Sequence, residues 1–458
     1  GPCRCPHVLP DDCGPDGCGP GRCAFRASRG CRAGPGGVPG DRGVTTGRGP
    51  ERLLLALLLV VVLTQRLALP LGATQVPLTL VLCLALLAVG AVTGRLVLDR
   101  TRTRLYVAAM STLVLLTVVA LLRGLSPSLT SLVLLLLLYA VVAVRPARLD
   151  RAAVDRLLDA YTTLMVVVAL VCLAQSATQY AGVPYRDWLS VVVPSELLVQ
   201  GYNTGDPLSY GSDIVRVNGV LFLEPSFVSY FLGLAGVVAL HRGRSTVVVA
   251  LLLLGLVPTL AGNGVVTLVL GVAVLAAGPA RRRLLVLVVP VLLAVVVAAV
   301  TPVGERFLTR LTEVGNEGSS LSLRLVEPYE RLLPSWALDP AAVLLGYGAG
   351  AGTDATAAGT AGLLSPALPK LLLEYGGPGT VVFLLFLLWS LVAGGGARPW
   401  APALLVSYLV LNAALLQVTL ALTTVLFLHL LRPWDGQGGA EAPEDDASRD
   451  QLPVRALP

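Results

Sequence analysis

Long apolar runs, separated by short clusters of charged residues, dominate this chain of 458 residues. Each run is close to the roughly 20 residues that an α-helix needs to cross the hydrocarbon core of a bilayer. Hydrophobic residues make up 55% of the chain and charged residues only 14%, with a mean hydropathy of +0.77. A soluble domain carries roughly 25% charged residues because it must cover its surface with them. We therefore expect an all-α, polytopic membrane protein without a soluble globular domain.

The apolar runs predict about twelve transmembrane helices, with a large extracytoplasmic loop between the ninth and the tenth. Most runs lack a polar stripe at helical spacing, which indicates contact with lipid or other helices on all sides. Two pairs, 246–278 and 401–431, hold roughly 15 residues per crossing, so each is either a short hairpin or a broken helix. The predicted spans are 53–70, 76–93, 105–122, 128–144, 158–179, 217–240, 246–260, 264–278, 284–300, 369–392, 401–415 and 417–431.

The basic residues predict the orientation of these spans. If the N-terminus is cytoplasmic, 25 of the 34 Lys and Arg residues fall in inside segments and 9 in outside segments. This is the bias of the positive-inside rule, so we expect a bacterial plasma-membrane protein with both termini in the cytoplasm and the long loops outside. The net charge of +6 then reflects topology, and no nucleic-acid partner is expected.

The two ends of the chain differ from its apolar middle. Residues 1–50 are rich in Gly, Pro and Arg and hold six cysteines without the CxxC spacing of zinc sites. We interpret them as a disordered cytoplasmic or non-native segment, because a reducing cytoplasm disfavours disulfides. Residues 51–432 form the predicted transmembrane domain. The polar, acidic residues 433–458 are expected to be a disordered cytoplasmic tail.

Two long outer loops are the expected places for chemistry, because the inside loops are short. The first runs from Tyr180 to Arg216 and continues as RVNGVLFLEPSF, in which Arg216 stands at the mouth of the next helix. Glu224, followed by Pro225, is expected about two turns inside that helix. A carboxylate at such depth costs roughly 2.5–3.5 kcal/mol, so Glu224 should face a cavity or a partner. A purely structural pair between Glu224 and Arg216 is the alternative.

Between the two long loops, Gly262-Asn263-Gly264 joins two short apolar runs. An Asn flanked by glycines most often forms only a tight turn. The alternative is a broken helix whose end lines a cavity, which is the geometry that membrane transporters use.

The second long loop, from Thr301 to Pro369, carries the richest set of candidate functional residues. Arg306 and Arg310 are one helical turn apart in it. Residues 323–338, which include Arg324, read as an amphipathic helix near the membrane surface. An aromatic side chain near its end, that of Trp336, is an expected interface anchor.

GYGAGAG, residues 346–352, follows this helix. Such glycines let the backbone turn sharply or approach a ligand closely, and a plain flexible loop is the alternative. The segment lacks the lysine of a Walker motif, so nucleotide binding is not expected. None of the histidines His7, His241 and His429 lies in an outer loop, and no metal site or Ser-His-Asp constellation can be assembled there. We therefore expect no metal and no other cofactor.

Taken in order, these segments resemble the bacterial O-antigen polymerase and ligase superfamily, which includes the exopolysaccharide polymerases of Gram-positive bacteria. The resemblance covers roughly residues 180–390. It rests on RVNGVLFLEPS, on the short-span pair with its glycine-rich junction and on the Ser-x-x-x-Arg of the long loop. It also rests on Gly-x-Gly-x-Gly and on the closing LPKLLLEYGGPG.

The resemblance implies a GT-C-like helix bundle and a metal-independent, inverting glycosyltransferase whose donor is a glycan on undecaprenyl pyrophosphate. Arg216 and Arg324 match the arginines that hold the lipid pyrophosphate, where guanidinium groups stabilise the charge on the leaving group. Glu224 and Glu374 are the candidates for orienting or deprotonating the acceptor hydroxyl. A flippase and a chain-length regulator are possible partners. The candidate substrate-binding residues are Arg306, Arg310, Asn263, Tyr329, Gly346, Gly348 and Gly350.

One departure from the family favours a polymerase over a ligase. Ligases usually place a histidine just before the closing helix, and here that stretch holds Lys370, the only lysine of the chain. We interpret Lys370 as a residue whose ammonium group reaches the membrane interface. The predicted function is polymerisation of lipid-linked repeat units outside the plasma membrane. Transfer of a lipid-linked glycan to a lipid, protein or wall acceptor, transport of lipid-linked sugars, and a non-catalytic scaffold are the alternatives.

Overall fold

The computed structural model describes residues 48–434, apart from 73, 203, 206, 208–213, 288–290, 293–295, 297–325, 352–365, 393–397 and 413–414. The expectations for residues 1–47 and 435–458 lie outside the described residues.

Helices dominate the described chain, as a polytopic membrane protein requires, since every backbone polar group in a bilayer has to be bonded within the protein. Three helices are long and apolar enough to cross a membrane: α3 (Arg100–Leu122), α5 (Arg151–Tyr180) and α16 (Ala367–Val392). The other helices of the bundle are α1 (Arg48–Leu63), α2 (Leu78–Val92), α4 (Leu129–Ala140), α7 (Pro225–Arg242), α8 (Thr246–Leu256), α9 (Gly262–Ala277), α17 (Ala401–Val406) and α18 (Val418–Val425).

A described helix overlaps every predicted span. In 284–300, however, the structure describes only residues 284–287, which end the 3-10 helix η4 (Pro279–Leu287), and residues 291–292 and 296. Most of the ninth span and much of the loop after it therefore lie outside the described residues, and the number of twelve spans stays a prediction.

The first predicted span, 53–70, is wrong in its second half. Helix α1 ends at Leu63, and β1 (Ala68–Leu71) pairs antiparallel with β2 (Thr74–Pro77). The run is apolar but contains Pro70 and is followed by Gly72, whose φ is 62°. Proline does not donate a backbone hydrogen bond and glycine adopts left-handed turns, so a hairpin forms here in place of a longer helix.

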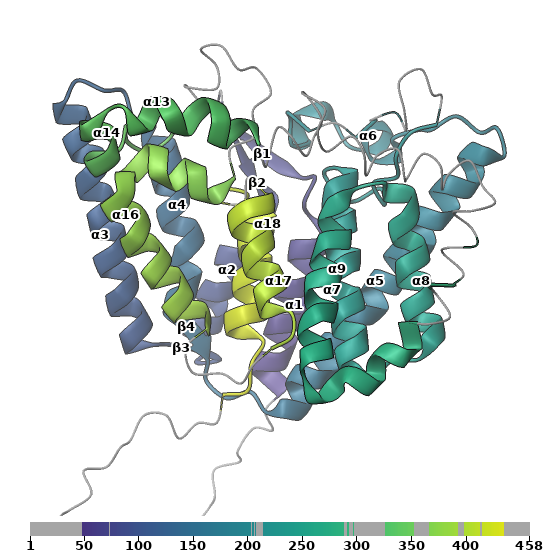
Figure 1. The fold of residues 1–458 in the computed structure, drawn as a ribbon. Coiled ribbons are helices and arrows are strands. Elements are labelled where there is room, and N and C mark those ends of the chain that lie inside the picture. The colour runs from purple at the N-terminus through teal and green to yellow at the C-terminus, as the bar shows by residue number, and fades with distance from the viewer. Residues whose placement is uncertain are drawn as a thin grey trace, which may run out of the picture. The chain divides into compact units, whose positions relative to one another are not determined.

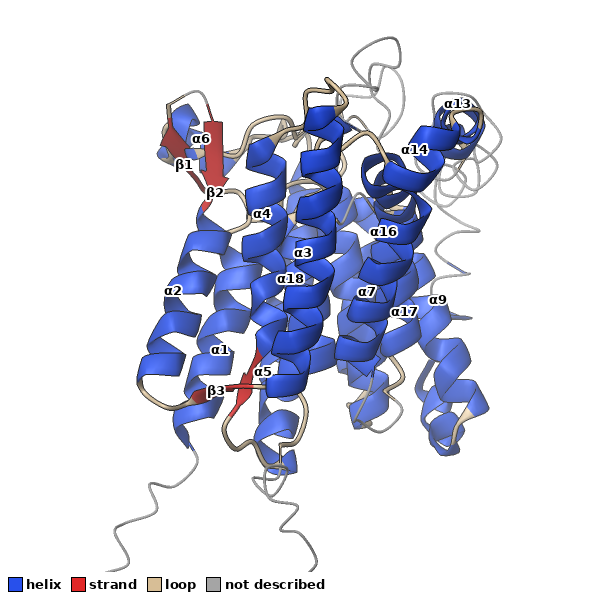
Figure 2. Cartoon of the chain, turned by 90° about the vertical axis from the view of Figure 1, so that its left-hand side faces the viewer, coloured by secondary structure: helices blue, strands red, loops and turns tan. Residues whose placement is uncertain are grey.

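The bundle has two ends that differ in what covers them (Figure 1 and Figure 2). One end carries the β1–β2 hairpin with α6 (Trp188–Val192), α13 (Leu333–Ala337) and α14 (Pro340–Leu345). The other carries the short pair β3 (Leu96–Leu98) and β4 (Val144–Pro146). At this second end Leu149 exchanges backbone hydrogen bonds of 3.2 and 2.8 Å with Trp434, the last described residue. We call the end that carries β1–β2, α6, α13 and α14 the loop end.

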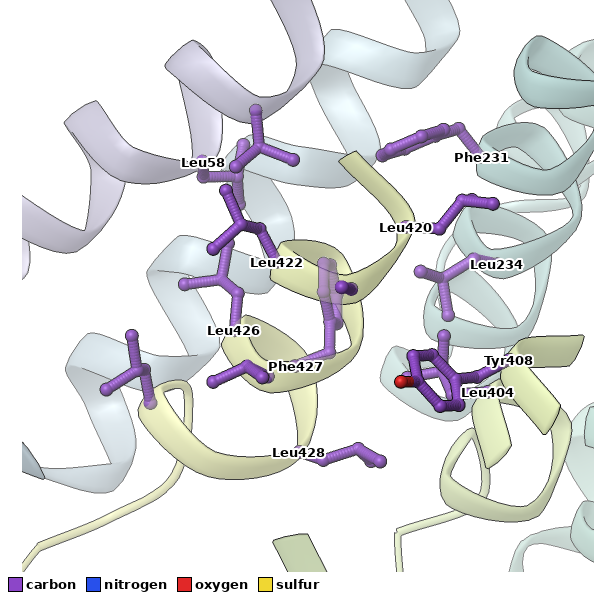
Figure 3. Packing of buried hydrophobic residues seen from close by; sticks show 14 of the residues in the cluster. Leu58, Phe231, Leu234, Leu404, Tyr408, Leu420, Leu422, Leu426, Phe427 and Leu428 are labelled. Atoms are coloured by element: carbon purple, nitrogen blue, oxygen red, sulfur yellow. The ribbon is translucent and has the colours of Figure 1, made fainter. Parts of the chain in front are cut away.

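Helix α7 is deeply buried, with every residue from Phe227 to Leu240 buried. It packs against α5, α8 and α9. Side chains of α7, such as Phe231 and Leu234, face others of α17 and α18 (Figure 3). An apolar helix without a polar face is explained by such contact on all sides.

Small residues allow α7 and α9 to touch through their backbones. A Cβ atom at Gly233 would collide with the carbonyl of Gly264, and one at Gly264 would collide with the carbonyl of Ser229. Interfaces between membrane helices favour such small residues, because close packing replaces the hydrophobic driving force that lipid removes.

Candidate functional site

The segment that enters α7, residues 214–224, is extended or turned rather than helical, and we call it the entry segment. Glu224 was expected two turns inside a helix, and that expectation is wrong. Its φ of −148° and ψ of 164° place it at the N-cap, with Pro225 as the first residue of α7. Proline is favoured there because its missing N–H would have no partner in the first turn. Glu224 is half-buried, and Ser226 Oγ lies 3.2 Å from its carboxylate.

Two glutamines of α5 bind the backbone of the entry segment. Gln179 accepts from the N–H of Val215 at 2.7 Å and donates to its carbonyl at 3.1 Å. Gln175 accepts from the N–H of Gly219 at 2.9 Å. The extended backbone near Arg216 thus satisfies its polar groups on amide side chains one helical turn apart.

Arg66, between α1 and β1, is a contact that the sequence did not indicate. It donates to both carboxylate oxygens of Asp187, at 2.7 and 2.5 Å, and to the carbonyl of Val220 at 2.9 Å. Its only sequence signal is an arginine inside an apolar run. Val220 has a φ of 65°, a conformation that a β-branched residue rarely adopts.

Burial and the charges near Arg66 perturb two ionisable groups. Burial raises the pKa of Tyr185 to about 12, and the negative charge of Asp187 adds to the effect. Burial would also raise the pKa of Asp187, but the hydrogen bonds and charge of Arg66 outweigh it, so the pKa of Asp187 is lowered. Asp187 is therefore a carboxylate at neutral pH.

Asn263 lies in the first turn of α9, so the expectation of a tight turn at Gly262–Gly264 is wrong. The reversal occurs before it, in a 3-10 turn η3 (Val257–Thr259) and at Leu260, whose φ is 44°. Ser229 Oγ donates to the carbonyl of Ala261 at 2.8 Å and accepts from the N–H of Gly264 at 2.9 Å. A side chain of α7 thereby caps the start of α9.

The amide of Asn263 is engaged within the protein. Asn263 Nδ2 donates to Asn412 Oδ1 at 2.7 Å, and Asn412 Nδ2 donates to Ser407 Oγ at 2.8 Å. Asn412 follows η7 (Ser407–Leu411), where the helix that begins with α17 ends before α18. Asn263 therefore joins the start of α9 to the break between α17 and α18.

Helix α16 is broken at Gly376, where φ is 66° and ψ is −175°. Glu374 is completely buried just before the break, and Lys370 Nζ lies 3.0 Å from its Oε1. The expectation that Lys370 reaches the membrane interface is wrong, because its side chain is only 11% exposed. A buried carboxylate of this kind holds its charge only with a partner, which the cation one turn away supplies.

Residues 346–351, which we call the glycine loop, pack against this break. Gly346, Gly348 and Gly350 have φ values of 70°, 91° and 81°. The N–H groups of Tyr347 and Gly348 donate to the carbonyls of Leu373 and Glu374 at 2.8 and 2.9 Å. Carbonyls that the interrupted helix leaves without helical donors are satisfied in this way.

These glycines are required by contacts within the protein. A Cβ atom at Gly346 would collide with the carbonyl of Glu374, and one at Gly350 would collide with Ser128. Arg123, at the end of α3, donates to the carbonyl of Gly346 at 2.9 Å. A role for the loop in binding substrate stays a prediction.

The helix expected over residues 323–338 is present from Glu327 to Ala337, as the π-helix η6 (Pro328–Leu332) followed by α13. It lies across the loop end (Figure 1). Tyr329 lies in η6. Trp336 Nε1 donates to the carbonyl of Ala342 at 3.1 Å, which ties α13 to α14. Arg306, Arg310 and Arg324 lie outside the described residues.

The described candidates form two groups. Arg216, Glu224 and Asn263 belong to α7, α9 and the segments that lead into them. Glu374 and the glycines belong to α16 and α14, which pack against each other and against α3. Figure 1 shows the two sets of helices on either side of α17 and α18. Among the described residues, no group of three or more His, Cys, Asp or Glu side chains could hold a metal ion.

A comparison with protein families finds a match to the model described as WcaD colanic acid polymerase, over residues 52–389. The chain belongs to the WcaD colanic acid polymerase family. The match begins in α1 and ends in α16, so it includes the entry segment, the start of α9, the glycine loop and Glu374. No curated protein and no solved structure matches the chain.

Membership of the WcaD family confirms the expected resemblance to the polysaccharide polymerases. It supports a membrane protein that polymerises lipid-linked repeat units into an exopolysaccharide, by a reaction of the glycosyltransferase type.

Proposed function

We propose that this chain extends a glycan on undecaprenyl pyrophosphate, on the outer face of a bacterial plasma membrane, by metal-independent transfer with inversion. The observation that carries the proposal is the entry segment, which contains Arg216, ends with Glu224 and is hydrogen-bonded by side chains from two other parts of the chain. Hydrogen bonds that fix this backbone also fix the positions from which Arg216 and Glu224 extend. Catalysis by preorganised charges needs such fixed positions.

In the proposed reaction the growing chain is the donor and the non-reducing end of a new repeat unit is the acceptor. The acceptor hydroxyl attacks the anomeric carbon, a glycosidic C–O bond forms, and the bond from that carbon to the pyrophosphate oxygen breaks. The electron pair leaves with undecaprenyl pyrophosphate, and the hydroxyl proton passes to a carboxylate. The attack from the opposite face produces inversion.

Arginine and helix ends would stabilise the leaving group. Arg216 and Arg324 are the proposed partners of the pyrophosphate, since a guanidinium group can form two parallel N–H···O hydrogen bonds to phosphate oxygens. The starts of α7 and α9 lie side by side, linked through Ser229, and the N-terminal end of a helix carries partial positive charge. Both features favour a pyrophosphate near Arg216.

Glu224 is the proposed base. It is half-buried and lies at the end of the entry segment, which also contains Arg216, whereas Glu374 is buried and paired with Lys370. Glu374 is thus the second candidate, with a role in holding the α16 break. Arg306, Arg310 and Tyr329 are proposed to contact the glycan, and a flippase and a chain-length regulator are proposed partners.

Gene deletion followed by mass spectrometry of lipid-linked glycans tests the proposal. We expect lipid-linked single repeat units to accumulate in the deletion strain. Expression of wild type should remove this accumulation, whereas expression of Arg216→Ala, Glu224→Gln or Arg324→Ala should not. Arg186→Ala is a matched control, because Arg186 is an exposed arginine of the first outer loop. Accumulated long polymer on the lipid would point to a ligase, and an unchanged lipid-linked pool would contradict any role in transfer.

A further inference from the structure

The entry segment contains an unfavourable backbone conformation at Val220. Gly219 and Val220 have φ values of 63° and 65° in succession. Glycine adopts this conformation freely, but a β-branched residue does not. Asn218 Oδ1 accepts from the N–H of Val220 at 3.1 Å, which closes the turn from one side. A second interaction is needed to hold the Val220 carbonyl.

Arg66 supplies that interaction from a rigid position. Its backbone carbonyl accepts from the N–H of Val199 at 2.9 Å, and Leu67 forms a backbone bridge with Leu198. Its guanidinium is almost fully buried and is oriented by the two hydrogen bonds to Asp187. Only one residue type offers this geometry: a planar fork that pairs with a carboxylate in two places and still donates to a carbonyl.

We propose that Arg66 is a positioning residue for glycan polymerisation: through the Val220 carbonyl it holds the turn that sets where Arg216 and Glu224 stand. The inference rests on the proposed function, because it assigns no chemistry to Arg66 itself. Asp187 orients Arg66 and brings the first outer loop onto the entry segment, since Thr204 Oγ1 also lies 3.3 Å from its carboxylate. The loop and the turn are therefore coupled through one guanidinium.

A positioning role and a merely structural role predict different results for a rescue experiment. Membranes that contain the full chain would be given lipid-linked single repeat units, and the initial rate of polymer formation would be measured. We expect Arg66→Ala to lower the rate about tenfold or more, because Val220 then loses the contact that holds an unfavourable φ. Arg66→Lys should also lower the rate, since an ammonium group cannot bind both carboxylate oxygens of Asp187 and the Val220 carbonyl in the same planar geometry.

Val220→Gly provides the rescue, because glycine holds a positive φ without help. We expect Val220→Gly alone to stay within about threefold of wild type, and the double variant Arg66→Ala/Val220→Gly to be several times faster than Arg66→Ala. A residue that only braced the outer loop would give no such rescue. The amount of each variant in the membrane and its thermal unfolding in detergent would show that slow variants are folded.

Arg186→Ala is the control, since Arg186 is exposed, adjoins Asp187 and contacts only the ring of Trp188 among the described interactions. A folded Arg66→Ala protein with wild-type rate, or a double variant as slow as Arg66→Ala, would overturn the inference. If the deletion strain accumulates repeat units while Arg66→Ala relieves them, the inference fails and the proposed function stands. If the deletion strain accumulates none, the proposed function fails and the inference fails with it.

Discussion

The ion pair between Lys370 and Glu374 is buried from solvent, with the two side chains 11% and 1% exposed. Removal of one partner leaves an uncompensated charge in a medium of low dielectric, which costs about 3–5 kcal/mol. Replacement of both partners by apolar side chains of similar volume is often neutral or stabilising. We therefore expect Lys370→Met and Glu374→Leu to destabilise the protein separately but much less together.

Thermal unfolding of the purified protein in detergent measures this effect. For a long chain, 1 kcal/mol shifts the melting temperature by about 2 °C, so each single variant should melt roughly 6–10 °C below wild type. The double variant should melt within about 3 °C of wild type. Single variants with the melting temperature of wild type would refute the reasoning, because they would show that neither charge is stabilised by the other.

The same three variants separate a structural role of Glu374 from a chemical one. If Glu374 only holds the break in α16, polymer formation returns in the double variant together with stability. A double variant that is stable but inactive would assign the proton transfer to Glu374 and remove it from Glu224.

Three further predictions follow from close contacts and charges. Gly264→Ala should lower stability by at least about 2 kcal/mol in thermal unfolding, because the new Cβ meets the Ser229 carbonyl, whereas Gly262→Ala, with no atom within 4 Å, should not. Gly346→Ala should reduce both stability and polymer formation more than Gly182→Ala. Both glycines have positive φ, but only Gly346 also touches the backbone of Glu374. Because the pKa of Asp187 is lowered on folding, its stabilisation is present above the pKa of an unfolded aspartate and is lost as the pH falls through the folded value. Below about pH 4, thermal unfolding should therefore depend more steeply on pH for wild type than for Asp187→Asn, and equal slopes there would contradict the assigned pair.

The helices could be predicted from the sequence because their signal is local. A run of apolar residues near the length of a bilayer crossing predicts a helix whatever its neighbours are. The boundaries were less accurate, as the hairpin β1–β2 shows in the span predicted for 53–70. Pro70 and Gly72 favour a hairpin there, although the residues around them are apolar. A prediction from the length of an apolar run does not take these two residues into account.

The sequence motifs predicted which residues are candidates for the site, but they did not predict the local structure and contacts of each residue. Glu224 and Asn263 were expected in a helix and in a turn, and the structure has them at an N-cap and in a first helical turn. Glu224 stands at the N-cap because Pro225 starts α7, and Asn263 is helical because Ser229 of α7 caps the start of α9. Lys370 was expected at the membrane interface, and its burial depends on how α16 packs against α14 and α3.

The sequence by itself determined the class of the protein, its membrane-crossing composition and the short motifs of its polymerase family. The tertiary structure alone decided which charges pair and which backbone turns are held. Arg66 reaches Asp187 across 121 residues and Val220 across 154. Contacts of this separation leave no periodic trace in the chain, because they depend on the packing of several helices at once.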